Sequence, residues 1–188
     1  MEIRKAYQEE AEDICPLILL AMEDIVYRFI GEDSKDKATQ FLNVLIKAKA
    51  NQYSYENCWV ILSQDTIVGS ALVYDGARLH ELRVPVRETI KTLYNRDFNP
   101  EDETQAGEYY IDCVGVHPDY QGQGIGTRLL NFLKGEYGSN QQGALGLLVD
   151  KGNPMAKKLY LKLGFEVTGD KTLMGKPMEH LQFRRKPT

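Results

Sequence analysis

Residues 121–127 read Gln-Gly-Gln-Gly-Ile-Gly-Thr, and glycines at alternate positions suit the binding of a phosphate group. A run of mostly apolar residues ends just before them at His117-Pro118, and an amphipathic helix is expected from about Ile125. A glycine lets a main-chain N–H group come close to an anion, and the N-terminus of a helix adds a partial positive charge. We therefore expect this stretch to hold a phosphate or a pyrophosphate.

Two common phosphate-binding patterns fit the stretch poorly. A Walker loop needs Lys-Ser or Lys-Thr directly after its last glycine, and no such pair follows any glycine here. The dinucleotide-binding fingerprint would use Gly122 and Gly124, but Thr127 stands where its third glycine belongs. Asp150 lies roughly where a ribose-binding acid could fall. A nicotinamide-dependent oxidoreductase thus stays open as a remote alternative.

A third pattern, Gln/Arg-x-x-Gly-x-Gly/Ala, fits at Gln121, Gly124 and Gly126. A second block begins at Asn153-Pro154, continues through a helical pattern to Tyr160, and ends in Leu-Gly-Phe. In these two blocks, which have about the expected order and spacing, the chain resembles the GNAT superfamily of N-acetyltransferases. The resemblance is strongest over residues 108–169 and extends more weakly over most of the chain.

The resemblance implies an α/β fold, with a mixed, mostly antiparallel, twisted sheet flanked by helices on both faces in a single domain of residues 1–188. It implies acetyl-CoA as cosubstrate, and a strand at Tyr109–Val116 that opens so that its main chain pairs with the pantetheine arm. The residues that it assigns to acetyl-CoA binding are Val114, Gly115, Val116, Gln121, Gly122, Gln123, Gly124, Ile125, Gly126, Thr127, Asn153 and Ala156.

Tyr160 is the residue that we expect to act as general acid. On residue type alone, a tyrosine on the apolar face of a helix packs in the core with its hydroxyl satisfied. The resemblance implies instead that this hydroxyl faces the sulfur of the thioester. An ordinary tyrosine pKa of about 10 is close enough to the roughly 8.5 of a thiol for proton transfer to a departing thiolate.

Glu108 and Asp112 are the candidate general bases. They alternate with Tyr110 along the expected strand and so should share one face with it. The resemblance places a glutamate base at Glu108 in some members of the superfamily, and Asp112 should lie closer to the thioester. Glu108 is the first choice and Asp112 the second. For either acid, a hydrogen bond within the sheet is the structural alternative, and it is favoured for Asp112. Cys113 has no recognisable histidine partner, so direct attack by an amine is favoured over an acyl-enzyme.

Simple periodicity predicts the elements that position these residues. Pro16 should start or kink the first helix, Gly31 should end it, and Gln64-Asp65 should form the turn of a hairpin. The expected elements before residue 75 are a strand at Glu2–Ala6, a helix at Gln8–Phe29, a second helix capped by Asp33 or Ser34, and hairpin strands at Cys58–Leu62 and Ile67–Tyr74.

Residues 75–107 are expected to form an irregular insertion. The segment contains Pro85, Pro100 and an acidic run at Glu101–Glu103, with a short helix possible at Glu88–Asn95. Long ordered loops in compact domains usually serve function. We expect a lid or wall of the acceptor site here, or else a solvated insertion that packs against a second copy in a homodimer.

Composition narrows the class of protein. The net charge of −4 speaks against nucleic acid or an anionic membrane as partner, and no apolar run is long enough to span a bilayer. Three well-separated cysteines lack metal-site spacing, so no metal is expected, and with no signal peptide they suit a reducing cytoplasm.

The predicted function is acetyl transfer from acetyl-CoA to a primary amine of a small molecule or peptide. Glu23 and Asp24 would suit a cationic acceptor. The alternative is a non-catalytic module that binds acyl-CoA or a protein partner.

Overall fold

The computed structural model of the chain describes residues 1–138 and 143–185. Seven strands form one sheet in the order β1-β2-β3-β4-β5-β7-β6, in which β4 and β5 are parallel and all other neighbours are antiparallel. The strands are β1 (Glu2–Lys5), β2 (Cys58–Ser63), β3 (Thr66–Asp75), β4 (Glu108–Val116), β5 (Ala144–Asp150), β6 (Glu166–Leu173) and β7 (Lys176–Phe183). The predicted α/β class with a mixed, mostly antiparallel sheet is confirmed.

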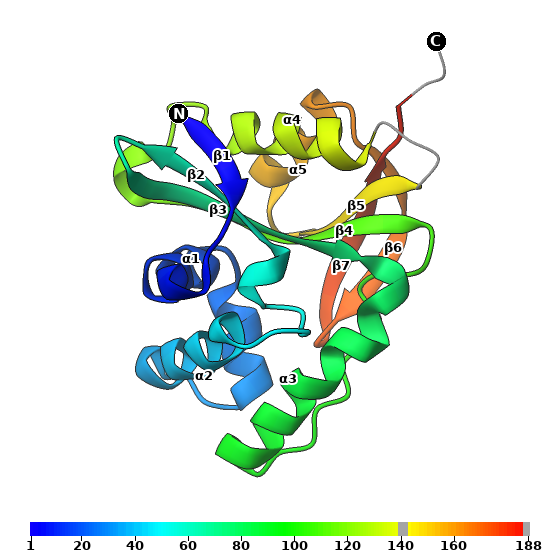
Figure 1. Cartoon of the computed structure of the whole chain (residues 1–188). Helices are drawn as coiled ribbons and strands as arrows, with labels where there is room; N and C mark the ends of the chain where they lie inside the picture. The colour runs from blue at the N-terminus through cyan, green and yellow to red at the C-terminus, as the bar shows by residue number, and fades with distance from the viewer. Residues whose placement is uncertain (139–142, 186–188) are drawn as a thin grey trace.

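Helices cover both faces of this sheet, as predicted. In Figure 1, α1, α2 and α3 lie below the sheet and α4 and α5 lie above it. The α-helices are α1 (Ala11–Ile30), α2 (Lys35–Lys47), α3 (Leu79–Tyr94), α4 (Ile125–Tyr137) and α5 (Pro154–Lys162). The short 3-10 helices are η1 (Gln8–Glu10), η2 (Tyr55–Asn57), η3 (Gly76–Arg78) and η4 (Pro118–Tyr120).

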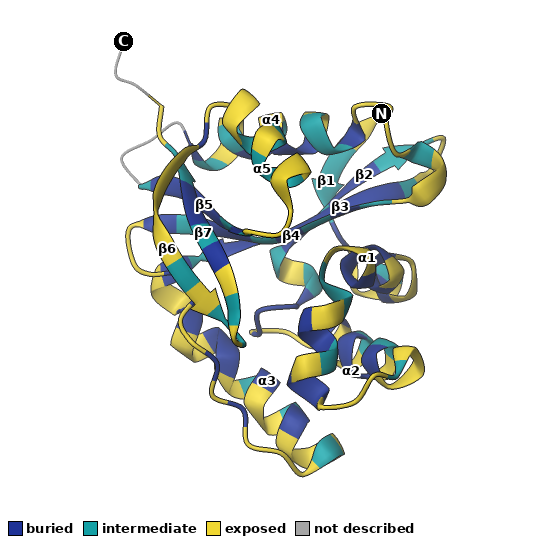
Figure 2. Ribbon diagram, turned by 180° about the vertical axis from the view of Figure 1, so that it is seen from behind, coloured by how far each residue is buried: buried dark blue, intermediate teal, exposed yellow. Residues whose placement is uncertain are grey.

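Each face of the sheet has its own hydrophobic core. The larger core joins α1 and α2 to the sheet and contains Ile18, Phe41 and Leu72. The second core lies under α4 and α5 and contains Leu129 and Phe165. Figure 2 shows buried residues along β3, β4 and β5, whereas the edge strand β6 is largely exposed. The centre of the sheet is therefore covered on both sides, which suits the nearly continuous apolar runs of its strands.

The kink in α1 lies at Met22 and not at Pro16, where the sequence predicts a start or a kink. Met22 has φ −144° and ψ 26°, outside the helical range, while the helix runs through Pro16. The residues around Pro16 are fully buried against the sheet, so their packing outweighs the hydrogen bond that a proline removes. Gly31 ends the helix with φ 75°, as predicted.

Local signals in the first half of the chain are confirmed where they rest on caps and turns. The Ser34 hydroxyl accepts the main-chain N–H of Lys37 and caps α2. Gln64 and Asp65 both have positive φ, 49° and 63°, in the two-residue turn between β2 and β3. That conformation matches the right-handed twist of the two strands and fixes their register.

Residues 75–107 are more regular than the sequence analysis predicts. Most of the first half forms α3, a 16-residue helix that contains Pro85. Its buried face follows helical spacing through Leu79, Leu82, Val86 and Ile90. This periodicity is visible in the sequence, but Pro85 within the helix and Pro100 after it obscured it. Residues 95–107 form no helix or strand, and they run back along α3 to the start of β4 (Figure 1).

Candidate active site

The sheet opens between β4 and β5. The two parallel strands pair only from Glu108 opposite Ala144 to Ile111 opposite Leu147. Beyond Ile111, β4 keeps its antiparallel partner β3, and β5 keeps β7, but the two strands no longer pair with each other. One edge of β4 therefore presents main-chain groups without a strand partner, next to a gap in the middle of the sheet. We call residues 108–111 the closed half of β4 and residues 112–116 its open half.

Asp112 is the extra residue of a β-bulge at the start of the open half. Leu72 of β3 pairs with Cys113 and Val73 pairs with Ile111, which leaves Asp112 without a cross-strand partner. A bulge reverses the alternation of the residues that follow it. Cys113 accordingly joins the core under α1, whereas Val114 packs in the core under α4. The predicted simple alternation along this strand therefore stops at Asp112.

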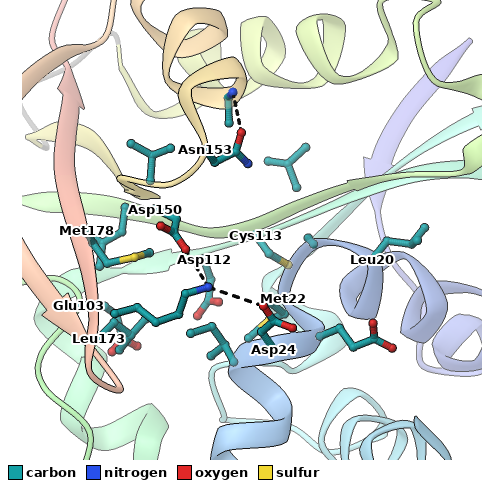
Figure 3. Close-up of a pocket in the computed structure, with 18 of the residues that line it drawn as sticks. Leu20, Met22, Asp24, Glu103, Asp112, Cys113, Asp150, Asn153, Leu173 and Met178 are labelled. Atoms are coloured by element: carbon teal, nitrogen blue, oxygen red, sulfur yellow. Dashed lines mark hydrogen bonds and ion pairs between the residues drawn. The ribbon is translucent and has the colours of Figure 1, made fainter. Parts of the chain in front are cut away.

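A cavity of about 720 Å³ occupies the opening and is lined from both sides of the sheet. Asn153, Ala156 and Tyr160 contribute from α5, and Asp112 and Glu103 from the side of α1 and α3. Figure 3 shows Asn153 on one side of the central strands and Asp112 and Glu103 on the other. The kinked part of α1, around Met22, closes the cavity from below. Two reactants could thus meet through the sheet.

Charge in this cavity is predominantly negative. Lys176 is the single lysine or arginine that lines it within the described residues, and its Nζ lies 2.7 Å from the Asp150 carboxylate and 3.8 Å from that of Asp24. The carboxylates in the lining are those of Glu23, Asp24, Glu103, Asp112 and Asp150. The positions of Lys176 and Glu103 beside these groups could not be predicted from sequence, because their partners lie far away along the chain.

The predicted phosphate loop has the geometry of an anion cradle. Gly122 and Gly124 have φ 74° and 80°, and a side chain at either position would point into open space. Gly124 precedes α4, and no side chain caps this helix. The six amides from Gly122 to Thr127 have no main-chain acceptor among the described residues. These N–H groups are therefore available to an anion at the positive end of a helix.

The glutamines of this loop hold its shape. The Gln121 side-chain amide donates to the Val116 carbonyl at 3.1 Å, and that of Gln123 donates to the Asp119 carbonyl at 3.0 Å. Ile125 packs at the foot of α4, with Val116 against it. The side chains thus brace the loop from behind and leave the main chain to contact a ligand.

Gly115 is required by the fold as well as by its place in the strand. A Cβ atom there would lie 2.0 Å from the Leu17 carbonyl oxygen of α1. Only glycine lets this helix approach β4 so closely. The contact brings α1 against the open half of the strand, next to Val114, which lines the cavity.

Asn153 caps α5, as its residue type predicts. Its side-chain oxygen accepts the main-chain N–H of Ala156 at 3.0 Å, and Pro154 occupies the first helical turn. Because the carboxamide nitrogen of Asn153 has no partner among the described residues, it can donate into the cavity that this residue lines. The same helix carries Tyr160 two turns further on.

Tyr160 presents its hydroxyl without a hydrogen-bond partner among the described residues. The ring packs edge-on against Phe165 at 5.9 Å between centroids, and the residue lines the cavity. Burial, with a smaller effect from Cys113, raises the pKa of Tyr160 to about 12. The hydroxyl therefore stays protonated at neutral pH. Transfer of its proton to a thiolate, whose thiol has a pKa of about 8.5, is less favourable than transfer from an ordinary tyrosine with a pKa of about 10.

Asp112 is the acid of β4 that faces the cavity. Burial raises its pKa to about 8, and the nearby negative charge of Glu103 acts in the same direction. The Tyr74 hydroxyl and the Arg83 guanidinium partly oppose the shift. A carboxyl group with such a pKa can take up a proton from an ammonium far more readily than an ordinary aspartate.

Glu108 lies in the closed half and does not line the cavity. Its buried carboxylate accepts hydrogen bonds from Thr104 at 2.6 Å, His180 at 2.8 Å and Gln182 at 2.7 Å. Desolvation favours the protonated form, but these hydrogen bonds outweigh it, led by that of His180, and lower the pKa of Glu108. The structure thus matches the alternative of an acid bonded within the sheet. Of the three candidate catalytic residues, Asp112 and Tyr160 line the cavity and Glu108 does not.

Three further observations concern His117, metal binding and membrane-spanning helices. His117 is exposed in the turn before the phosphate loop, where its Nδ1 accepts the Asp119 N–H at 3.3 Å. Within residues 1–138 and 143–185, no three His, Cys, Asp or Glu side chains form a group that could hold a metal ion. In the same residues, no helix combines the length and apolar character needed to cross a membrane.

Comparisons with known proteins agree with this geometry. The family model described as "Acetyltransferase (GNAT) family" matches residues 22–165. A solved structure of an acetyltransferase is 29% identical, with 98% of this chain and 99% of that chain covered and a TM-score of 0.81. An N-acetyltransferase from Staphylococcus aureus Mu50 is 24% identical, with 97% and 100% covered and a TM-score of 0.82.

More distant structures share the fold alone. The ribosomal-protein-S18-alanine N-acetyltransferase from Escherichia coli is 15% identical, with 99% of this chain and 96% of that chain covered and a TM-score of 0.57. No curated protein matches the chain in sequence. The family match covers most of the chain and includes the open strand, the phosphate loop and the helix of Tyr160. The chain belongs to the GNAT family of acetyltransferases.

Proposed function

We propose that this protein transfers the acetyl group of acetyl-CoA to a primary amine of a small molecule or peptide. The observation that carries the proposal is the cavity through the open sheet, which has Tyr160 on one side and Asp112 on the other. A proton donor and a proton acceptor thus lie in one cavity, reached from opposite layers. Membership of an acetyltransferase family gives this arrangement its chemistry.

The phosphate loop and the open strand fit the donor. The free amides from Gly122 to Thr127 can hold the pyrophosphate, with space beside Gly122 and Gly124 that no side chain fills. The unpaired edge of β4 at Val114 and Val116 can pair with the pantetheine arm, as an added strand would. The Asn153 carboxamide can supply a further donor. Bound acetyl-CoA would supply an activated thioester.

The two ionisable groups then move the protons. An acceptor that is an ammonium first gives one proton to water. The neutral amine nitrogen then forms a bond to the thioester carbonyl carbon, and the bond from that carbon to sulfur breaks. Asp112 takes the proton that the nitrogen must lose, and Tyr160 gives its proton to the departing thiolate. Both residues return to their starting states by exchange with water. We prefer Asp112 to Glu108 as the base because three donors hold Glu108 away from the cavity.

A cationic acceptor suits the lining on the α1 side. Glu103 places residues 95–107 in the wall of the cavity, which supports a role for this segment as part of the acceptor site. Glu23 and Asp24 add negative charge at the kink of α1. Carboxylates attract an ammonium group and orient it, so we propose amines that carry a positive charge as the first candidates.

The test is turnover of acetyl-CoA across a panel of amines, measured as release of free thiol together with product mass. Diamines, amino sugars and peptides with a free N-terminus cover the candidate acceptors. Calorimetry with CoA measures donor binding separately. Thiol release that depends on an amine supports the proposal. CoA binding without any turnover would favour the non-catalytic module instead, and no binding of CoA or acetyl-CoA would overturn both.

A further inference from the structure

Arg83 is a buried cation that ties α3 to the segment that follows it. Its guanidinium donates to the Glu103 carboxylate at 2.5 Å, to the Asp102 carboxylate at 3.0 Å and to the Pro100 carbonyl at 3.2 Å. A charge taken out of water is tolerated only when partners compensate it. These contacts therefore fix residues 100–103 against α3 in one arrangement.

Glu103 is the buried partner that reaches the cavity. Besides the Arg83 guanidinium, it accepts hydrogen bonds from the Tyr74 hydroxyl at 3.0 Å and from the Gln52 side chain at 2.5 Å. Donors from three separate segments thus hold one carboxylate in place. Glu103 also lines the cavity together with Asp112, and both lie on the same side of the sheet in Figure 3.

We propose that Arg83 and Glu103 form a positioning pair for Asp112, in which the fixed Glu103 carboxylate makes its neighbour a better proton acceptor. The inference rests on the proposed function, in which Asp112 receives the proton of the amine. A like charge beside a carboxylate favours the protonated form, and a cation opposes that effect. The Arg83 guanidinium lies against the Glu103 carboxylate in the protein interior, where it compensates the buried negative charge.

Most other titratable groups around Asp112 are either neutral or paired with one another. Four neighbouring groups are neutral, because burial raises the pKa of Tyr53, Tyr74, Tyr110 and Cys113. The remaining titratable groups of the cavity are Glu23 and Asp24 on α1, Asp150 on β5, Tyr160 on α5 and Lys176 on β7. Lys176 is paired with Asp150 and Asp24. Within the described residues, Glu103 and Arg83 are the charges that act on Asp112.

The test compares variants of Glu103 by the titration of the Asp112 carboxyl carbon, followed by NMR in protein labelled with ¹³C-aspartate. Asp112→Asn identifies the signal. Glu103→Gln keeps the size of the side chain and removes its charge, so the midpoint for Asp112 should fall by about one pH unit. Glu103→Asp keeps the charge and should restore most of the shift. The acid limb of kcat/KM should move in the same direction in each variant.

Two further variants test the pair. Asp102→Asn removes the half-exposed carboxylate partner of Arg83, which does not line the cavity, and should leave the Asp112 midpoint in place. Arg83→Met removes the cation that lowers the pKa of Asp112, so the midpoint for Asp112 should rise. An unchanged Asp112 midpoint in folded Glu103→Gln protein would overturn the inference. Because the titration needs no substrate, this result is separate from any failure to find an acceptor amine.

Discussion

The closed and open halves of β4 each contain an acid, and the two acids have opposite environments. Glu108 lies where β4 pairs with β5, and three hydrogen-bond donors lower its pKa. Asp112 lies at the bulge where the pairing ends, and burial raises its pKa to about 8. The residues are four apart on one strand, so residue type and local sequence do not separate them. Strand pairing decides which acid is available for chemistry.

The largest expected effect separates these two acids by activity. Asp112→Asn should lower kcat/KM by about 10²–10⁴-fold, because general base catalysis is lost. Glu108→Gln should lower it by less than about tenfold, since that residue acts on the fold and not on the substrate. Steady-state kinetics with the best amine measures both. Equal losses in two folded variants would contradict the assignment of the base.

Tyr160 of α5 lines the same cavity as Asp112 and Val114 of the open half, and it provides a second test. Tyr160→Phe should lower kcat by roughly 10²-fold, because the departing thiolate loses its proton donor. CoA affinity, measured by calorimetry, should stay within about twofold, since the ring and its packing against Phe165 remain. A variant with full activity would mean that the thiolate leaves without help from this hydroxyl.

Single added methyl groups compare the surroundings of the two halves, and the first of them, at Gly126 of α4, lies beside Val116 of the open half. In Gly126→Ala the added Cβ meets only the Val116 side chain at 3.7 Å, so the fold is preserved, but CoA affinity should fall at least about tenfold as the cradle fills. Gly135→Ala, in the same helix with open space around it, is the matched control for helix propensity. Its CoA affinity should match that of the parent.

A methyl group added beside the closed half, at Gly146 of β5, should lower stability and leave CoA affinity unchanged. In Gly146→Ala the added Cβ would lie 2.0 Å from the Glu108 carboxylate, which is held by three donors and cannot yield freely. We expect a loss of about 1–3 kcal/mol in the free energy of unfolding, with CoA affinity unchanged below the melting transition. Urea denaturation and calorimetry give the two numbers. Loss of CoA binding in a folded Gly146→Ala protein would break the comparison.

The smallest effect is the dependence of stability on pH. The lowered pKa of Glu108 stabilises the fold above the unfolded value of about 4.3, and this contribution is lost as pH falls through the folded pKa. The raised pKa of Asp112 acts oppositely: stability falls as pH rises from about 3.9 toward about 8. At pH 8, Asp112→Asn should therefore stabilise the protein by about 1–3 kcal/mol and Glu108→Gln should destabilise it. Urea denaturation at pH 5 and pH 8 measures these differences, and a destabilised Asp112→Asn at pH 8 would count against the raised pKa.

Features that depend on neighbours in sequence could be predicted. The glycine spacing of the phosphate loop, the cap at Asn153 and the turn at Gln64-Asp65 are properties of short segments, and the structure has each of them. The two blocks that resemble the GNAT superfamily also sufficed for the class of the sheet, mixed and mostly antiparallel, because the resemblance implied it. The helical face of α3 was equally local, and Pro85 within the helix obscured it.

Features that depend on distant partners could not be predicted. The bulge at Asp112 results from the register of β3 against β4, which no residue of β4 specifies by itself. Glu108 meets His180 and Gln182 only because β7 inserts beside β5. Glu103 is paired with Arg83, twenty positions earlier in a helix that sequence reading left incomplete. Sequence therefore named both candidate acids and ranked Glu108 first, whereas of the two only Asp112 lines the cavity.

The hydrogen bonds of Glu108 also have a mechanical consequence. Strands β1–β4 and β5–β7 are two half-sheets whose seam is the short ladder between β4 and β5. Glu108 reaches across Gly146 of β5 to His180 and Gln182 of β7, so it staples one half-sheet directly to the other. This link lies at the end of the β4–β5 ladder that is farther from the opening. It fixes the two half-sheets to each other at this end. The width of the opening at the other end then depends on the twist of the two half-sheets.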